Sequence, residues 1–266
     1  MTPRVRAAVD ADLPAIAEIA VANDEEDGAD PHYVAHLRGH GRFLVAEAEA
    51  DGGPAGYCGV RRTGEVTMLT DLFVHPDRHG GGTGRRLLDA AFDGAGERST
   101  FASRDPRAMS LYVRYGMVPR WPLLYLSGPP PGAGALRAER VPMAEAAIAE
   151  SALNGRDRAA DYAFWATRPD ATGLIACEGG AVVAAGAAGP GRVFHLVTAD
   201  GHDAAATLAA ALAEVGAGPV RLCLPGPHPA LRRLLDAGWR IEDSDQHMSS
   251  RPDLLSPADV LSPSLG

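Results

Sequence analysis

Residues 74–88, VHPDRHGGGTGRRLL, contain the residue types whose spacing is best suited to chemistry. A predicted strand ends near Pro76, four glycines follow between positions 80 and 84, and a predicted helix begins after them. Such a junction binds phosphate well. The N–H groups of the first helical turn are unpaired, the helix dipole is positive there, and glycine lets a ligand approach the backbone. The stretch predicts a site for a phosphorylated ligand, with a flexible turn before a helix as the alternative.

Two common phosphate-binding loops do not fit this spacing. A P-loop requires G-x-x-x-x-G-K-[ST], and residues 74–88 contain no lysine. A dinucleotide fingerprint requires G-x-G-x-x-G at the first strand–helix turn of the chain. Here the glycines follow several strands that look antiparallel, so the loop belongs to another kind of site.

The elements that must position this loop can be predicted on both sides of it. Strands are expected at 42–50, 55–63, 65–74, 99–103 and 121–128. Helices are expected at 11–23, 83–95 and 105–116, with Asp12 and Asp105 as N-caps and Gly116 as a C-terminal stop. The continuous apolar run Leu72–Val74 predicts a strand end that is buried on both faces.

The chain looks duplicated around a linker. Residues 128–135, GPPPGAGA, combine prolines and glycines and mark a domain boundary. Beyond it, 172–188 repeats the strand–turn–strand pattern of 41–60, and 228–240 repeats the helix pattern of 105–117. In place of the glycine cluster the second copy has only Gly201. We expect a duplication in which one copy lost the loop; the alternative is a shared strand–helix rhythm by chance.

Composition restricts the partners and the compartment. The 266 residues carry a net charge of −9, which argues against duplex nucleic acid or anionic lipid as a partner. The first residues lack the apolar core of a signal peptide, and no run reaches transmembrane length, so a cytoplasmic protein is expected. Three separated cysteines, Cys58, Cys177 and Cys223, fit a reducing compartment, and no metal site is expected from them.

Two motifs together resemble the GCN5-related N-acetyltransferase (GNAT) family. Val74, Pro76 and the glycines at 80, 82 and 84, followed by Leu87, match its acyl-CoA-binding motif V-x-P…G-x-G-x-G-x-x-L. His79 is a departure, since the family usually has Gln or Arg before the first glycine. The second signature, A-x-x-L-Y followed by glycine and an apolar residue, matches Ala108–Tyr112 with Gly116 and Met117.

The resemblance implies a fold and a domain organisation. The fold class would be α/β (α+β), with two tandem GNAT-like domains, each a mixed, mostly antiparallel sheet flanked by helices. An active domain would span 1–128, a linker 129–135, a degenerate domain 136–250 and a C-terminal tail 251–266. In the degenerate copy Leu234 stands in place of Tyr112 and the loop is absent, so that copy would bind no CoA.

The resemblance also implies acetyl-CoA as the acyl donor. In the family the strand that carries Leu72–Val74 splays from the next one at a bulge, the pantetheine arm enters that gap, and the pyrophosphate binds amides around Gly80–Arg85. The residues expected to bind the donor are Leu72, Phe73, Val74, Arg78, His79, Gly80, Gly81, Gly82, Thr83, Gly84, Arg85, Asp105 and Ala108.

The implied reaction is direct attack of an amine on the thioester. The amine must lose a proton, the oxyanion needs a donor and the leaving thiolate needs an acid. A backbone N–H near Val74 would be the donor. Tyr112 would be the acid, although a tyrosine there could equally be a core aromatic. The base stays open between Asp71, Glu65 and an ordered water.

The expected function is therefore acetyl transfer from acetyl-CoA to a primary amine of a small molecule, by a monomer or homodimer. The alternatives are a non-catalytic acyl-CoA sensor, another acyl donor or a protein amine as acceptor. The acidic stretch 23–30 could attract a cationic amine or be a solvated loop. In the second copy Tyr162, Phe164 and Trp165 could line an acceptor pocket or belong to the core.

Overall fold

The computed structural model describes residues 4–24, 30–48, 53–94, 96–103, 105–130, 132, 134–216 and 218–266. The contacts within the chain define two compact units. Unit 1 comprises Met1–Thr100, Ser110–Val118 and Ser249–Arg251; unit 2 comprises Phe101–Met109, Pro119–Met248 and Pro252–Gly266. Each unit is described by itself below.

The sheet of unit 1 has the strand order β1-β2-β3-β4-β5. Neighbouring strands are antiparallel as far as β4, and β4 and β5 are parallel. The strands are Val5–Ala7 (β1), Gly41–Glu47 (β2), Pro54–Thr63 (β3), Val66–Val74 (β4) and Glu97–Ala102 (β5). The helices are Leu13–Val21 (α1), Pro31–His40 (α2), Thr83–Ala91 (α3) and Pro106–Arg114 (α4), with 3-10 turns at Asp10–Asp12 (η1) and Pro76–Arg78 (η2).

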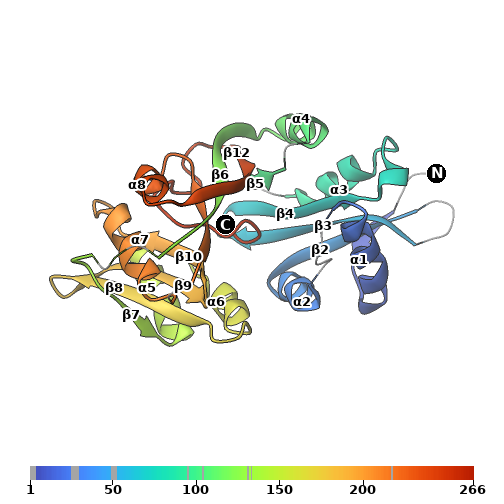
Figure 1. Cartoon of the computed structure of the whole chain (residues 1–266). Coiled ribbons are helices and arrows are strands. Elements are labelled where there is room, and N and C mark those ends of the chain that lie inside the picture. Colours follow the sequence, from blue (N-terminus) through green and yellow to red (C-terminus); the bar gives the residue numbers. More distant parts are fainter. Residues whose placement is uncertain are drawn as a thin grey trace. The chain divides into compact units, whose positions relative to one another are not determined.

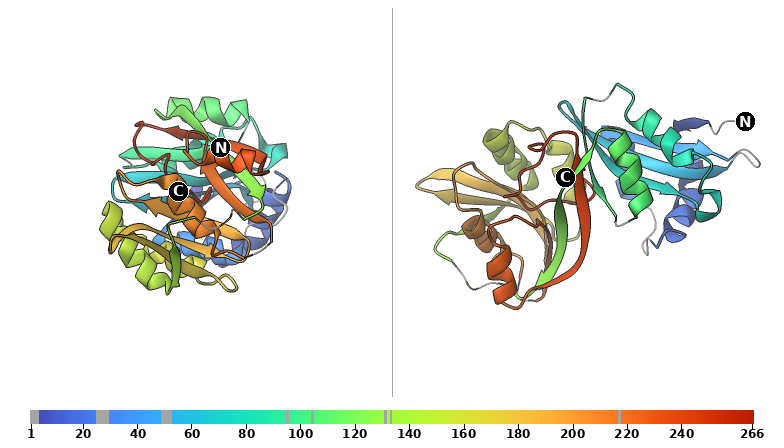
Figure 2. Two further views of the ribbon diagram at one scale, coloured as in Figure 1. Left: turned by 60° about the vertical axis from the view of Figure 1, so that its left-hand side comes forward. Right: turned by 90° about the horizontal axis from the view of Figure 1, so that it is seen from above.

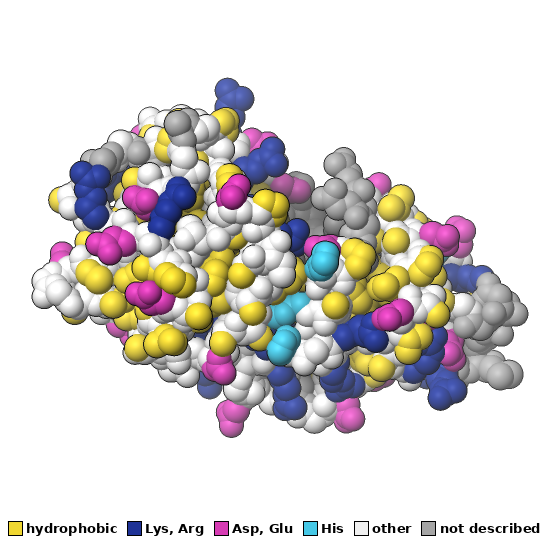
Figure 3. Space-filling view, turned by 90° about the horizontal axis from the view of Figure 1, so that it is seen from below, with side chains coloured by type: hydrophobic (Ala, Val, Ile, Leu, Met, Phe, Trp, Pro, Cys, Tyr) yellow, Lys and Arg dark blue, Asp and Glu magenta, His cyan; other side chains and the backbone are white. Residues whose placement is uncertain are grey.

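Helices cover both faces of this sheet, with α1 and α2 on one face and α3 on the other (Figure 1). Ile16 of α1, Leu37 of α2 and Leu87 of α3 are fully buried against the strands. Burial of each such side chain stabilises the unit by about 1.5–3 kcal/mol. Three histidines, His32, His36 and His40, follow one another at four-residue spacing along α2. Figure 3 shows histidine side chains gathered on the face seen from below.

The sheet of unit 2 has the strand order β7-β8-β9-β10-β11-β6-β12. Its strands are Val118–Gly128 (β6), Ala138–Val141 (β7), Thr172–Glu178 (β8), Ala181–Gly189 (β9), Arg192–Thr198 (β10), Val220–Pro225 (β11) and Arg240–Ser249 (β12). Its helices are Met143–Asn154 (α5), Ala159–Trp165 (α6), Ala204–Leu212 (α7) and Leu231–Asp236 (α8). The long strands β6 and β12 lie side by side (Figure 2).

The elements repeat in the same order in the two halves of the chain. Two helices follow the first strand of each half, one helix precedes the parallel strand and one follows it. The segments predicted as counterparts, 41–60 and 172–188, form β2–β3 and β8–β9, and 105–117 and 228–240 contain α4 and α8. The predicted repeat, with a mixed, mostly antiparallel sheet and flanking helices in each copy, is therefore confirmed.

The compact units do not follow the order of the chain. β6, the last strand of the first copy, pairs with β11 from Val220↔Gly128 to Pro225↔Leu123, and most of it therefore belongs to unit 2. Part of the proposed linker 129–135 lies outside the described residues. The boundaries 1–128, 136–250 and 251–266 remain a prediction about the sequence.

Several local predictions need correction. Helix α3 ends at Ala91 rather than near residue 95. Asp12 precedes α1, but its carboxylate accepts from the Val9 amide and from Arg6, not from the helix. Helix α2 was not predicted at all. The run Leu72–Val74 is only half-buried, although its apolar pattern predicted burial on both faces.

Candidate functional site

The loop between β4 and α3 requires glycine at two positions for conformational reasons. Gly80 has φ +84° and Gly82 has φ +80°, in the left-handed region that other residues adopt at a penalty. No atom lies within 4 Å of a Cβ built on either residue, so the backbone, not crowding, requires glycine there. The resulting loop is exposed from Pro76 to Gly82 and leaves room above its backbone.

The N-terminus of α3 has no side-chain cap. Gly82 is the N-cap residue and, as a glycine, has no side chain that could accept a hydrogen bond from the first helical turn. Arg78 and Arg85 are exposed on either side of the glycines. Helix α3 is anchored by Leu87 and Leu88, which are fully buried. A rigid helix thus presents N–H groups and its positive end at an open loop, which fits a pyrophosphate.

Strand β4 changes its partners in the middle. Its parallel pairing with β5 runs from Val66↔Glu97 to Leu69↔Thr100 in the described part of the chain. Thr70 is then an extra residue opposite β3, because Gly59 pairs with Asp71 and Val60 pairs with Leu69. Such a bulge bends the strand and re-aims its side chains. Beyond it, β4 continues beside β3 as far as Val74↔Gly56.

This change of partners explains why Leu72, Phe73 and Val74 are half-buried rather than enclosed. The carbonyl of Val74 is not left bare, because Asn23 Nδ2 donates to it at 3.2 Å and His79 Nε2 at 3.0 Å. The resemblance placed His79 among the residues expected to bind the donor. In the structure its imidazole also folds back onto the strand that enters the loop.

Asp71 lies directly after the bulge and points towards α2. One of its carboxylate oxygens, Oδ2, accepts from Tyr33 Oη at 2.8 Å and from Thr70 Oγ1 at 2.7 Å. A Cβ on Gly59 would lie 2.8 Å from the same oxygen, so only glycine leaves space for this carboxylate. Burial raises the pKa of Asp71 above 3.8, while the hydrogen bonds from Thr70 and Tyr33 act in the opposite direction. A carboxylate with a raised pKa is a stronger base than an ordinary one.

Sequence reasoning missed Tyr33 because it missed α2. A usable signal was present: Asp30 and Pro31 begin α2 as Asp105 and Pro106 begin α4, with the Asp30 carboxylate accepting from the His32 amide at 2.9 Å. The helix has a weak apolar pattern, since three histidines and an arginine are spread among its apolar residues. Of the acidic stretch 23–30, residues 25–29 lie outside the described residues.

Tyr112 is buried on α4, and its carbonyl accepts from the amides of Tyr115 and Met117, which end the helix. The neighbouring Leu111 packs against the first turn of α3, 3.8 Å from a Cβ built on Gly84. The second tyrosine in this region, Tyr115, has a hydroxyl that is already hydrogen-bonded. Tyr115 Oη donates to Asp89 at 2.6 Å and to the Arg85 carbonyl at 3.0 Å, and burial and Asp89 raise its pKa to about 12. Of the two tyrosines, Tyr112 is the one that stands at the tyrosine position of the A-x-x-L-Y signature.

Three further residues that the sequence singled out are Asp105, Ala108 and Glu65. Asp105 caps α4, since its carboxylate accepts from the Arg107 amide at 2.8 Å. By their contacts, Asp105 and Ala108 belong to unit 2, whereas the loop, Asp71 and Tyr112 belong to unit 1. Glu65 is exposed before the start of β4, at the other end of the strand from the glycines. It is too far along the strand to serve a site at Val74.

No group of three or more His, Cys, Asp or Glu side chains in the described part of the chain could hold a metal ion. No helix there is long and apolar enough to cross a membrane. The three cysteines are free, with Cys58 and Cys223 buried and Cys177 exposed.

Comparison with known proteins agrees with this geometry. Residues 39–118 match the family model of the acetyltransferase (GNAT) domain. No curated protein matches the sequence. A putative acetyltransferase from Pyrococcus horikoshii has a similar structure, with a TM-score of 0.74 and 15% identity over 100% of this chain and 96% of that one.

Two other solved structures resemble the whole chain. A tandem GNAT protein from the clavulanic acid biosynthesis pathway has a TM-score of 0.61 and 15% identity, covering 96% of this chain and 99% of that one. A GCN5-related N-acetyltransferase from Sphaerobacter thermophilus has a TM-score of 0.61 and 18% identity, covering 93% and 95%. At these identities the likeness concerns the fold. The family model covers β2 to α4, and the likeness to the solved structures extends over both copies. The chain therefore has a tandem GNAT-like fold, an acetyltransferase fold that supports acyl transfer.

Proposed function

We propose that unit 1 transfers an acetyl group from acetyl-CoA to a primary amine of a small molecule. The observation that carries the proposal is the course of β4. After its bulge the strand leaves β5, presents Asp71 towards α2, and runs into a glycine loop at the uncapped N-terminus of α3. The phosphates of the donor would thus bind at one end of the short segment 71–82, and the proton of the acceptor would be accepted at its other end.

The donor fits the residues of this segment. The amides of the first turn of α3, with Arg78 and Arg85 beside them, would bind the pyrophosphate. The half-buried run Leu72–Val74 would lie along the pantetheine arm, where apolar side chains and backbone groups are both within reach. The positive φ of Gly80 and Gly82 keeps this loop open to the ligand.

The reaction requires two proton transfers. The amine nitrogen attacks the thioester carbonyl carbon, and a new C–N bond forms while the C–S bond breaks. Asp71 would accept the proton that the amine loses, directly or through a water, because its raised pKa makes it a usable base. A backbone N–H near Val74 would stabilise the oxyanion, and Tyr112 would donate a proton to the leaving thiolate.

The acceptor class follows from charge. An anionic base that lies between β4 and α2 favours an acceptor that arrives as a cation and reacts as a free amine. The carboxylate of Asp71 faces α2, where it accepts from Tyr33 Oη at 2.8 Å. A small amine is therefore preferred over an acceptor whose recognition would depend on apolar or anionic groups.

The test is release of CoA thiol from acetyl-CoA by the full chain against a panel of aminoglycosides, polyamines and amino acids. We expect release that depends on at least one primary amine. Tyr112→Phe should lower kcat by about 10- to 100-fold, with little change in the Kd for acetyl-CoA, because an acid acts in the transition state.

The alternatives give different results in the same assay. Binding of acetyl-CoA without turnover of any amine would favour a sensor. Faster turnover with longer acyl-CoA would identify another donor, and turnover only with peptides would identify a protein acceptor. Unchanged kcat in the Tyr112→Phe variant would remove the acid role from that residue.

A further inference from the structure

Unit 2 contains its own version of the strand that parts from a parallel neighbour. β10 pairs with β11 at Arg192↔Arg221, and Phe194 is then an extra residue opposite β9, between the pairs Val193↔Ala188 and His195↔Ala187. As in unit 1, the parallel pairing ends just before a bulge. The first residue after the bulge, His195, has the place that Asp71 has in β4.

In unit 2 the chain itself fills the interval between the two strands. The amide of Leu196 donates to the Val260 carbonyl at 3.1 Å, and the amide of Val260 donates back to the Leu196 carbonyl at 2.9 Å. On the other side, the amide of Leu261 donates to the Cys223 carbonyl of β11 at 3.2 Å. Residues 259–261 thus form hydrogen bonds to both β10 and β11, as a short inserted segment with one isolated β-bridge, Leu196↔Val260.

Side chains fix the inserted segment. Val260 and Leu261 are 0% and 2% exposed, and Leu265 is 5% exposed. The carboxylate of Asp259 accepts from the amide of Thr198, the last residue of β10, at 3.2 Å. Apolar burial and backbone pairing therefore act together on one short stretch.

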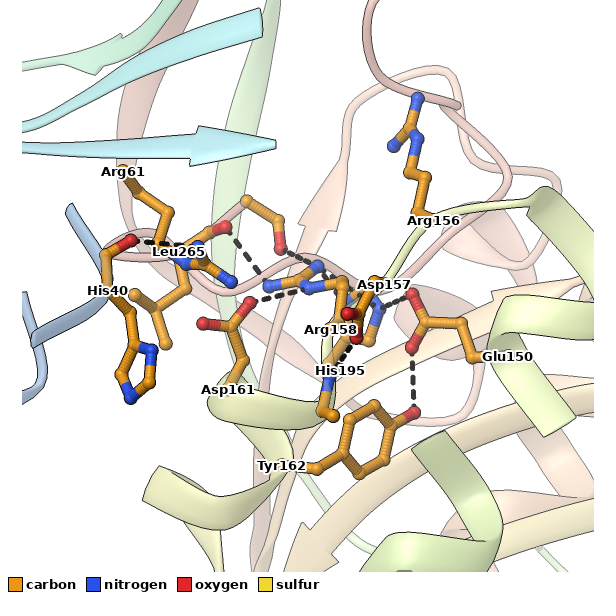
Figure 4. Close-up of polar contacts among 12 residues, drawn as sticks. His40, Arg61, Glu150, Arg156, Asp157, Arg158, Asp161, Tyr162, His195 and Leu265 are labelled. Carbon is orange, nitrogen blue, oxygen red and sulfur yellow. Dashed lines mark hydrogen bonds and ion pairs between the residues drawn. The ribbon is translucent and has the colours of Figure 1, made fainter. Parts of the chain in front are cut away.

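The far end of the segment is held by a buried arginine (Figure 4). Arg158 donates from Nη1 to the Gly266 carbonyl at 2.6 Å and from Nη2 to the Leu265 carbonyl at 3.0 Å, and its Nε donates to Asp161 at 2.8 Å. Burial alone would lower the pKa of Arg158, but Asp161 and the nearby Glu150 raise it, so the guanidinium stays charged. A buried cation needs all its partners, so displacement of 265–266 would leave donors unpaired.

Arg158 also contacts His195, which has the position in β10 that Asp71 has in β4. Buried side chains therefore surround the position that corresponds to the proposed base of unit 1. Glu150 accepts from Tyr162 Oη at 2.7 Å, and His195 Nε2 lies 3.2 Å from its other oxygen. Tyr162, Phe164 and Trp165 are all buried, as the core interpretation of these aromatics predicted. Tyr162 packs edge-on against Trp165. Glu150, Tyr162 and His195 are 1%, 1% and 2% exposed.

The helix N-terminus of unit 2 is also occupied. Asp203 is the N-cap of α7, and its carboxylate accepts from the amides of Ala205 at 2.9 Å and Ala206 at 3.2 Å. The corresponding Gly82 of α3 offers no such acceptor. An anion on the first-turn amides of α7 would compete with a carboxylate that is covalently in place.

We propose that residues 259–266 and Asp203 are resident occupants of the acyl-donor site of unit 2, held by Arg158, so that each chain binds one acyl-CoA. The inserted segment takes the place of the pantetheine arm and Asp203 takes the place of the pyrophosphate. This rests on the proposed function of unit 1, where the N-cap residue of α3 is a glycine and the described pairing of β4 with β5 ends at Leu69↔Thr100. Unit 2 is then closed by its own chain, in addition to lacking the glycine loop.

Hydrogen exchange of the full chain without ligand tests the occupancy. The amides of Leu196, Val260 and Leu261 should be protected like those inside β9. Val260→Pro removes the amide that bonds to Leu196 and should raise exchange at Leu196 about tenfold or more. The matched control Val260→Ala keeps the amide and should change it much less. Unprotected amides at 260–261 in the unchanged chain would overturn the proposal.

A second variant covers the case in which Val260→Pro fails to fold. Arg158→Lys keeps the positive charge but cannot donate to two carbonyls at once. Exchange at 260–261 should rise by about three- to tenfold, through loss of one or two hydrogen bonds. Equal exchange in Arg158→Lys and the unchanged chain would show that Arg158 does not hold the segment, and would overturn that part of the proposal.

Native mass spectrometry with acetyl-CoA tests the stoichiometry. One bound acetyl-CoA in the unchanged chain, and none after Gly82→Asp, would support the proposal. Two bound molecules, one of which persists after Gly82→Asp, would overturn it. No binding at all would overturn the proposed function of unit 1 instead, while protection of 260–261 would still support the resident segment.

Discussion

β4 and β10 begin alike and end differently. Each is paired with a parallel strand at its start, each has one bulge opposite its antiparallel neighbour, and each parts from its parallel partner there. After the bulge, β4 has a half-buried apolar end and leads to an uncapped helix. After its bulge, β10 is bonded to residues 259–260 and leads to a helix capped by Asp203.

Some features of these strands belong to the fold, and others belong to the site of unit 1 alone. The bulge and the parting strands belong to the fold, because they occur in both copies. The interval between the parted strands is available to a ligand in one copy only. It depends on whether another segment of the chain lies between those strands. In unit 2 the polar groups of the parted strands are satisfied internally, as buried backbone groups must be. In unit 1 the described chain provides no such strand, which is why a ligand is expected there.

The largest effect is expected when unit 1 is given the cap of unit 2. Gly82→Asp places a carboxylate at the N-terminus of α3 and a side chain at φ +80°. Both changes oppose an anion at the first-turn amides, so affinity for acetyl-CoA should fall at least about 100-fold. Isothermal titration measures the Kd. The matched control is Gly64→Asp, which makes the same change at φ +58° in the β3–β4 turn. Similar loss in both variants would refute a local effect.

The next largest effect should come from the residue after the bulge. Asp71→Asn keeps the size of the side chain but removes the base, and kcat should fall about 10²- to 10³-fold at pH 7. The free energy of unfolding should rise in the same variant. The folded pKa of Asp71 is raised above 3.8, so its ionisation destabilises the fold as pH rises from 3.8 through the folded pKa.

Urea unfolding at low and neutral pH measures this second consequence. Asp71→Asn should gain stability relative to the unchanged chain at pH 7 and lose that advantage near pH 3, where both states bind the proton. A variant that is both inactive and less stable at pH 7 would point to a structural role for the carboxylate.

A smaller effect is expected from the tyrosine that sequence reasoning missed. Tyr33→Phe removes a hydrogen bond that lowers the pKa of Asp71, so the acid limb of the kcat/KM profile should move to higher pH. Tyr115→Phe is the matched control, because it removes a hydroxyl that bonds to Asp89 and Arg85 instead. If both variants shift the limb equally, Tyr33 does not position or tune the base.

The smallest effect should come from the cap of unit 2. Asp203→Ala removes two hydrogen bonds to α7 and should lower the free energy of unfolding by about 1 kcal/mol. The Kd and number of bound acetyl-CoA should not change, because residues 259–261 still fill the strand interval. Urea unfolding measures the free energy of unfolding. Isothermal titration calorimetry measures the Kd and the number of bound acetyl-CoA. A second bound acetyl-CoA would show that Asp203 alone had closed the site.

Local patterns predicted those parts of the molecule that depend on nearby residues. The glycine loop, the strand before it and the helix after it were readable because turn conformation and helix start are short-range properties. The repeat was readable for the same reason, from two strand–turn–strand segments and two helices that end in glycine. Helix α2 was missed because its apolar spacing is weak, and with it Tyr33 was missed as the partner of Asp71.

What the sequence by itself determined is which copy has an open phosphate loop, since Gly80 and Gly82 have no counterpart beyond Gly201 in the second. Only the tertiary structure decided how the second copy is closed. The contacts of Leu196 with Val260 and of Arg158 with Leu265 join residues 64 and 107 positions apart. No local pattern encodes such pairs, because they form only when the sheet brings distant backbone groups within hydrogen-bonding distance.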